Sequence, residues 1–208
     1  MRVLPSDLTP YARARNAALE GFARDGVAST SIRDVAKAAG VSPGLVQHHF
    51  PTKAALIQAV NDYVIEIATD AFSKPPASSS PTNVQQELGD RVTAFMREHP
   101  TALLYVARST ADGDEAVLGI FDAFLRIAQA QWQTLADHDL LRVDADLTWA
   151  ALHVVVLNLG TILLTEAINR HLPASFFSDE QLERWNAASN ALFREGMYRS
   201  PSAQQATD

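Results

Sequence analysis

The sequence predicts an all-α protein with about nine helices, in which an N-terminal three-helix helix-turn-helix head precedes a C-terminal antiparallel helical bundle. Three observations support this prediction. Apolar side chains recur at helical spacing in nearly every part of the 208 residues, and no segment alternates apolar and polar residues as a half-buried strand does. The segment 31–53 also contains the start, turn and restart signals of two short helices.

The first helix is expected from about residue 10 to residue 25. Thr9 is a suitable N-cap, and Pro10 takes the first helical position, where a backbone N–H is not needed. Gly26 ends the helix. The inner face is formed by small and aromatic residues: Ala14, Ala17, Ala18 and Phe22.

The second and third helices form the helix-turn-helix. Ser31 is the first N-cap, with Asp34 at capping-box spacing, and Gly40 supplies the left-handed backbone that ends the helix. Ser42 then caps a new helix that begins with Pro43. From Ile32, the spacing needed for two closely crossing helices is completed by Ala36, Gly40 and Val46.

The rest of the chain is predicted to be helical too. A fourth helix is expected over 53–72, and a linker rich in proline and serine follows at 73–81. Five further helices are expected at about 84–98, 101–110, 115–136, 146–172 and 179–197. The helix at 146–172 is apolar nearly all round and therefore must be covered on several sides.

The net charge of −7 is divided unevenly along the chain. Residues 1–60 hold seven basic and four acidic side chains, a balance of +3, whereas the remainder holds ten basic and twenty acidic side chains, a balance of −10. A basic segment that coincides with a helix-turn-helix is typical of proteins that bind the phosphates of DNA.

Residues 14–56 resemble the tetracycline-repressor (TetR) family of bacterial transcription regulators. The matching residues are Ala17, Ala18, Phe22, Gly26, Val35, Ala36, Ala39, Gly40, Val41, Ser42, Gly44, His48, Phe50, Lys53 and Leu56. Gln47 stands where the family usually has Tyr, and His49 where an aromatic residue is often found. The resemblance implies a DNA-binding domain at 1–53 and a ligand-binding and dimerisation domain at 54–199. The second domain would begin with a connecting helix at 54–72 and a linker loop at 73–81. A disordered tail would follow at 200–208.

The DNA-contacting residues are expected on the third helix and around it. Val46 and Phe50 should face inward, which leaves the other side of that helix to the major groove: Ser42, Pro43, Gly44, Leu45, Gln47 and His48, with His49 either contacting DNA or packing locally. Lys53 starts the fourth helix and combines its charge with free backbone N–H groups, as a phosphate site requires. By resemblance, Thr30, Ser31 and Arg33 would meet the sugar-phosphate backbone, or a base edge in the case of Arg33. Ser31 and Ser42 can also act as caps alone.

A small, largely apolar effector is expected in the second domain. The candidate lining is aromatic with a few polar groups: Phe95, Met96, Tyr105, Arg108, Phe121, Phe124, Trp132, Trp149 and His153. Each aromatic residue could equally be ordinary core. The family plan places the end of the helix at 146–172 and the last helix in a homodimer interface: Val156, Gly160, Leu163, Leu164, Trp185, Ala188, Leu192 and Phe193. The alternative is that these helices complete a monomer core.

The sequence thus predicts a homodimeric regulator, in the manner of a repressor, that binds double-stranded DNA at a palindromic operator and is released by an effector. Two alternatives stay open: a helical protein-interaction module without DNA binding, and an enzyme built on Asp112, Asp114 and Glu115, which a solvated turn explains as well. No cofactor or metal is expected, since the chain lacks cysteine and no histidine pair has a carboxylate at ligand spacing. Without an export signal or an apolar run of about 18 to 20 residues, we expect a cytoplasmic protein with no membrane partner.

Overall fold

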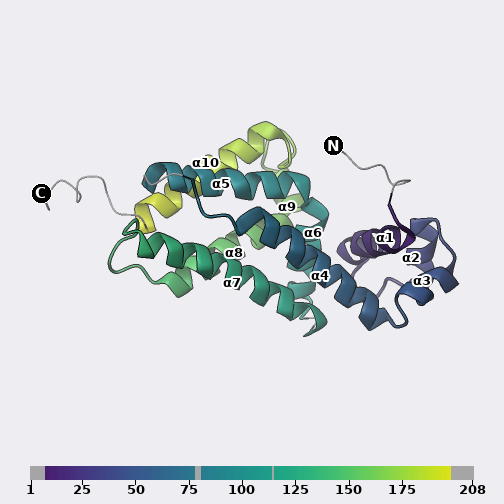
Figure 1. Cartoon of the computed structure of the whole chain (residues 1–208). Helices are drawn as coiled ribbons and strands as arrows, with labels where there is room; N and C mark the ends of the chain where they lie inside the picture. The colour runs from purple at the N-terminus through teal and green to yellow at the C-terminus, as the bar shows by residue number, and fades with distance from the viewer. Residues whose placement is uncertain (1–7, 78–80, 114, 198–208) are drawn as a thin grey trace, which may run out of the picture. The chain divides into compact units, whose positions relative to one another are not determined.

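The computed structural model describes residues 8–77, 81–113 and 115–197 (Figure 1). These residues form ten helices and no β-strand. The helices are α1 (Pro10–Asp25), α2 (Ile32–Ala39), α3 (Pro43–His49), α4 (Lys53–Phe72), α5 (Pro81–Glu98), α6 (Pro100–Ala111), α7 (Glu115–Asp137), α8 (Leu147–Leu163), α9 (Thr165–Asn169) and α10 (Asp179–Met197). The all-α prediction is confirmed. None of the described helices is long and apolar enough to cross a membrane.

The predicted helix at 146–172 is wrong in one respect, because the structure divides it into α8 and α9. The Thr161 hydroxyl donates to the Leu157 carbonyl at 2.7 Å, and the Thr165 hydroxyl donates to the Thr161 carbonyl at 3.0 Å. Such back-bonding tends to bend helices. After α9, the Asn169 side chain accepts from the Phe176 backbone N–H at 2.8 Å and holds the turn that follows. This division raises the count from about nine to ten.

The chain forms two compact units, and the boundary differs from the predicted one at residue 53. Unit 1 comprises the described residues up to 67 together with 101–122, and unit 2 comprises 68–100 and the described residues from 123 onward. Of the predicted linker at 73–81, residues 78–80 lie outside the described part, and Pro81 already belongs to α5. The predicted tail at 200–208 also lies outside it.

In unit 1, α1, α2 and α3 gather around one small core (Figure 1). Phe22 from α1, Val35 from α2 and Val46 from α3 are each 1 % exposed or less. The predicted turn signals act as expected, since Gly26 ends α1 at φ 89° and Gly40 ends α2 in the left-handed region at φ 64°. The helices of the head therefore end where the local sequence predicts that they end.

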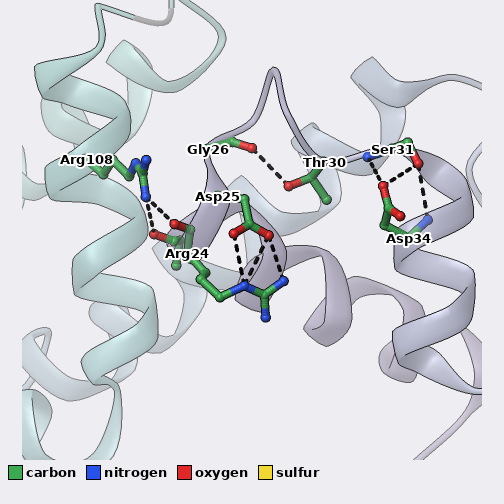
Figure 2. Close-up of polar contacts among 8 residues, drawn as sticks. Arg24, Asp25, Gly26, Thr30, Ser31, Asp34 and Arg108 are labelled. Atoms are coloured by element: carbon green, nitrogen blue, oxygen red, sulfur yellow. Dashed lines mark hydrogen bonds and ion pairs between the residues drawn. The ribbon is translucent and has the colours of Figure 1, made fainter.

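Helix α6 packs into unit 1, although the sequence assigned it to the second domain. The Tyr105 hydroxyl donates to Asn61 Oδ1 of α4 at 2.7 Å, and the Tyr105 ring lies 6.0 Å from the Phe22 ring of α1. The Arg108 guanidinium donates to the Arg24 and Ala23 carbonyls at the end of α1 (Figure 2). A cation at a helix C-terminus satisfies carbonyls that have no partner within the helix and complements the helix dipole.

Unit 2 is built around the pairing of α5 with α10 (Figure 1). Gly89 of α5 permits a very close approach, because a Cβ at this position would lie 2.5 Å from Asn190 Nδ2 of α10. Gln85 Nε2 donates to the Asn190 backbone carbonyl across the same contact. Arg97 at the end of α5 pairs with Asp179 at the start of α10, at 3.0 Å.

Candidate DNA-binding surface

Helix α3 presents one polar face to solvent. Its N-cap Ser42 accepts from the Leu45 backbone N–H at 3.2 Å, and Pro43 follows in the first helical position. Val46 and Phe50 are buried beneath the helix, at 0 % and 2 % exposed, as their four-residue spacing predicts. The exposed side chains and backbone are those expected to meet DNA: Ser42, Pro43, Gly44, Gln47 and His48, with Leu45 half-buried between them.

His49 is half-buried and makes local contacts within the head. Its ring meets Tyr11 of α1 edge-on, with ring centroids 5.9 Å apart, and the Tyr11 ring packs in a tilted arrangement against Phe50, with ring centroids 4.8 Å apart. The His48 and His49 rings lie 5.4 Å apart. Tyr11, which the sequence analysis did not single out, therefore packs against the C-terminal end of α3.

The start of α2 lies beside this face and is held by a complete capping box (Figure 2). Ser31 Oγ accepts from the Asp34 N–H at 3.2 Å, and the Asp34 carboxylate accepts from the Ser31 N–H at 3.1 Å and from its hydroxyl at 2.5 Å. These bonds, the hydroxyl bond first, lower the pKa of Asp34 below its ordinary value. Ser31 and Arg33 are exposed, as expected.

Thr30 requires a correction. The sequence analysis placed it against the DNA backbone, but its side chain is 4 % exposed and its hydroxyl donates to the Gly26 carbonyl at 2.9 Å. Its methyl group faces Gly21 of α1. Thr30 thus completes the end of α1 from inside the head, and its side chain is not available to a phosphate.

Lys53 is the first residue of α4, and the preceding residue caps that helix, since Thr52 Oγ1 accepts from the Ala55 N–H at 3.0 Å. The Lys53 ammonium donates to the Ala28 carbonyl at 3.3 Å. This bond holds the charge near the loop between α1 and α2. Arg24 is engaged elsewhere, because its guanidinium donates to the Asp25 carboxylate at 2.7 to 3.1 Å and lowers the pKa of Asp25.

Two comparisons with known proteins show the family to which the chain belongs. The family described as "Bacterial regulatory proteins, tetR family" matches residues 15–60, which span α1 to the first part of α4. The regulatory protein RaaS of Mycobacterium tuberculosis, described as an HTH-type transcriptional regulatory protein, is 32 % identical over 133 residues, which cover 64 % of this chain and 55 % of RaaS. The chain belongs to the TetR family.

Other relatives match a smaller share of the chain. The transcriptional regulator UidR of Escherichia coli is 41 % identical over 63 residues, 30 % of this chain and 32 % of UidR. The chain thus spans about half of RaaS and a third of UidR. Both named relatives are described as transcriptional regulators.

Solved structures share the fold of about nine tenths of the chain. A γ-butyrolactone receptor (ArpA-like protein) matches with a TM-score of 0.70 at 19 % identity, covering 91 % of this chain and 88 % of the receptor. Salmonella enterica GusR matches with a TM-score of 0.65 at 22 % identity, covering 89 % and 95 %. At these identities the likeness shows the fold alone.

The residues expected to line an effector pocket are divided between the two units of this TetR protein. Tyr105, Arg108 and Phe121 belong to unit 1, where Tyr105 is fully buried and Arg108 caps α1. The six others belong to unit 2: Phe95, Met96, Phe124, Trp132, Trp149 and His153. Phe95 and Phe124 pack with ring centroids 6.5 Å apart, whereas Trp149 is 57 % exposed and lies against His153.

The residues expected in a dimer interface fall into two groups. Val156, Leu163, Leu164 and Leu192 are 42 to 64 % exposed, and Ala188 is exposed beside them on α10. Gly160 has open space where a Cβ would point. Trp185 and Phe193 are half-buried and turn toward the interior of unit 2, where Trp185 meets Phe176 and Phe193 meets Trp132, each with ring centroids 6.2 Å apart.

The sequence analysis missed a cluster of amide side chains in unit 2. Gln85 and Gly89 lie one turn apart on α5, and Asn186 and Asn190 lie one turn apart on α10. Together with residues of α7 and α8 they border a cavity of about 590 Å³, counting the part open to solvent. The four-residue spacing of Asn186 and Asn190 was visible in the sequence, but only the pairing of α5 with α10 brings these two residues beside Gln85.

Proposed function

We propose that this chain is a homodimeric DNA-binding transcription regulator, acting as a repressor, that binds a palindromic operator through α3 and is released by a small effector held in the second domain. The observation that carries the proposal is the exposed polar face of α3 over the buried Val46 and Phe50, at the head of a TetR-family chain. A helix whose inner side is anchored and whose outer side is polar and glycine-containing fits the major groove.

The charges around α3 support contact with phosphates. Arg33, Lys37 and Lys53 lie on or at the start of α2 and α4, while Asp34 is engaged in the capping box. Phosphate contacts of this kind position a recognition helix without reading sequence, whereas Gln47 and Leu45 could read an adenine edge or a thymine methyl group.

A second copy of the chain is the proposed partner of the exposed apolar side chains of α8 and α10. Val156, Leu163, Leu164 and Leu192 expose large apolar groups that a monomer in water would rarely leave uncovered on neighbouring helices. A twofold dimer would present two α3 helices to half-sites one helical turn apart. An effector that prefers one spacing of the heads would shift the dimer away from the DNA-competent state; one solved structure of this fold is described as a γ-butyrolactone receptor.

The test is binding of the full chain to labelled DNA from the intergenic region upstream of its gene, followed by fluorescence anisotropy. Lys53→Glu should weaken binding at least tenfold and reduce the slope of log affinity against log salt by about one or more. Lys74→Glu makes the same charge change at an exposed position of unit 2 and should leave affinity nearly unchanged. Equal effects of both variants would contradict the proposal.

The dimer is tested separately by sedimentation. Leu192→Asp should shift the wild-type dimer toward monomer, and DNA binding should fall with it. A wild-type dimer that binds no DNA would instead favour a helical interaction module.

A further inference from the structure

The cavity in unit 2 is lined by apolar side chains and by uncharged polar side chains. Four helices contribute to it: α5, α7, α8 and α10. Its apolar part comes from Leu88, Val92, Trp132, Leu135, Val154, Trp185 and Phe193, and its polar part from Gln85, Gln131, Asn158, Asn186, Ser189 and Asn190. None of the described residues that line it is charged.

An ion would enter this cavity at a high cost. A charged group that leaves water needs an opposite charge or several hydrogen bonds, and the described lining offers no ionised side chain. The nearest carboxylate in the amide network is Asp90, which accepts from Asn186 Nδ2 at 2.9 Å and from Gln86 Nε2 at 2.8 Å. A negative charge behind the wall disfavours anionic molecules further.

The direction of the amide network is determined by Asp90. An ionised carboxylate only accepts hydrogen bonds, so Asn186 must turn its Nδ2 toward Asp90 and its Oδ1 away from it. Asn186 Oδ1 then accepts from Asn190 Nδ2 at 3.0 Å. The side-chain nitrogens of Asn186 and Asn190 therefore each donate a hydrogen bond to another side chain of unit 2.

The remaining amides of the wall follow the same rule. Gln85 Nε2 donates to the Asn190 carbonyl, Gln131 Nε2 donates to the Phe72 carbonyl at 3.3 Å, and Asn158 Nδ2 donates to the Val154 carbonyl at 2.6 Å. Asn158 Oδ1 is buried and accepts no hydrogen bond from the described part of the chain. A buried acceptor without a donor is destabilising, because it has lost its hydrogen bonds to water. Asn158 Oδ1 is thus a buried acceptor of this wall for which the described residues supply no donor.

We infer that this cavity binds an uncharged molecule with a flat apolar body and at least one N–H or O–H group, which donates a hydrogen bond to Asn158 Oδ1. The rings of Trp132, Trp185 and Phe193 supply the surface for the flat body. The inference rests on the proposed function only where it regards this molecule as the effector. The site itself lies within unit 2 and needs neither DNA nor the head.

Three probes that differ in one property each test this class. Indole is flat, uncharged and carries an N–H donor; 1-methylindole lacks the donor; indole-3-carboxylate adds a negative charge. In isothermal titration calorimetry of the full chain, indole should bind about tenfold more tightly than 1-methylindole, because a site built around an acceptor rejects the analogue without the donor. Indole-3-carboxylate should bind at least tenfold more weakly than indole.

Variants assign the effect to Asn158. Asn158→Leu should bring the affinities for indole and 1-methylindole within about twofold of one another. Asn83→Leu, the same replacement at an exposed position of α5, should leave the tenfold ratio unchanged. Val154→Trp should fill the cavity and abolish binding of both probes, and Leu88→Trp does the same from α5 if the first variant does not fold.

The inference is overturned if indole does not bind, if 1-methylindole binds equally well, if the carboxylate binds more tightly, or if both folded filling variants still bind indole. DNA binding of the same preparation, measured without any probe, tests the proposed function independently. Indole binding without DNA binding would leave the cavity inference standing and remove the regulator proposal, whereas DNA binding without indole binding would do the reverse.

Discussion

Gly21 of α1 lies close against the side chain of Thr30 inside the head. A Cβ at residue 21 would lie 2.8 Å from Thr30 Cγ2 and 3.3 Å from Thr30 Oγ1. The threonine cannot turn away without loss, because its hydroxyl donates to the Gly26 carbonyl at 2.9 Å and its side chain is buried. Gly21→Ala is therefore the most informative substitution in the head.

Two effects of opposite sign decide the outcome of Gly21→Ala. In a helix interior, alanine is favoured over glycine by up to about 1 kcal/mol. Overpacking a closed core costs about 1 to 3 kcal/mol, and breaking the Thr30 hydrogen bond to relieve the overlap costs about 1 kcal/mol. We therefore expect a net loss of about 1 to 2 kcal/mol in the free energy of unfolding, where helix propensity alone predicts a gain.

A double-mutant cycle isolates this overlap. Thr30→Ser removes Cγ2 but keeps the hydroxyl, at a cost of about 1 kcal/mol for the lost methyl group. In that background, Gly21→Ala should cost little or nothing, so the coupling between the two sites should be about 1 to 2 kcal/mol. Urea unfolding followed by circular dichroism, at one protein concentration, measures all four proteins.

The matched control is Gly44→Ala in α3, where no atom lies within 4 Å of the added Cβ. Its stability should stay level or rise by up to about 1 kcal/mol, while its affinity for DNA should fall if α3 approaches the groove closely. The reasoning fails if Gly21→Ala is more stable than the wild type, or if its cost is the same in the Thr30→Ser background as beside the native threonine.

Three further outcomes follow from the contacts described. Arg108→Met should destabilise the chain by about 1 kcal/mol, since the guanidinium is partly exposed, and should speed hydrogen exchange at the end of α1; unchanged exchange would refute the capping role. Burial lowers the pKa of His99 below its ordinary 6.5, so its neutral form is favoured in the fold and stability should decline as pH falls from about 6.5; His99→Gln should flatten this decline in thermal melts. The pKa of Asp34 is lowered by its bonds to Ser31, so its contribution is complete above the unfolded value of 3.8 and is lost as pH falls through the folded one; Asp34→Asn should remove this acid dependence from the amide protection of α2.

The head was the most predictable part of the molecule. The cap at Ser31, the left-handed Gly40 and the proline at the start of α3 act within a few residues of themselves, and the structure has each of them where the sequence predicts it. The same holds for most helix ends, such as those of α4 and α10. The exception was α8, because apolar content predicts burial but does not show where threonine back-bonding ends a helix.

The candidate site was only partly predictable for a related reason. The four-residue spacing of Val46 and Phe50 showed which side of α3 is buried, and hence which side is free. It did not show that Thr30 turns inward, because its partners, Gly21 and Gly26, lie on another element. Tyr11 supports α3 from α1 and was missed on the same ground.

Helix caps, turn glycines and apolar spacing act over a few residues, so the helices and the helix-turn-helix could be predicted from the sequence alone. Folding in three dimensions decided the partners that are distant along the chain. Arg108 caps a helix that ends more than eighty residues earlier, and Gln85 meets Asn190 across more than a hundred. Such pairings depend on which faces pack against one another, and a linear pattern of apolar spacing states that a face is buried without stating what covers it.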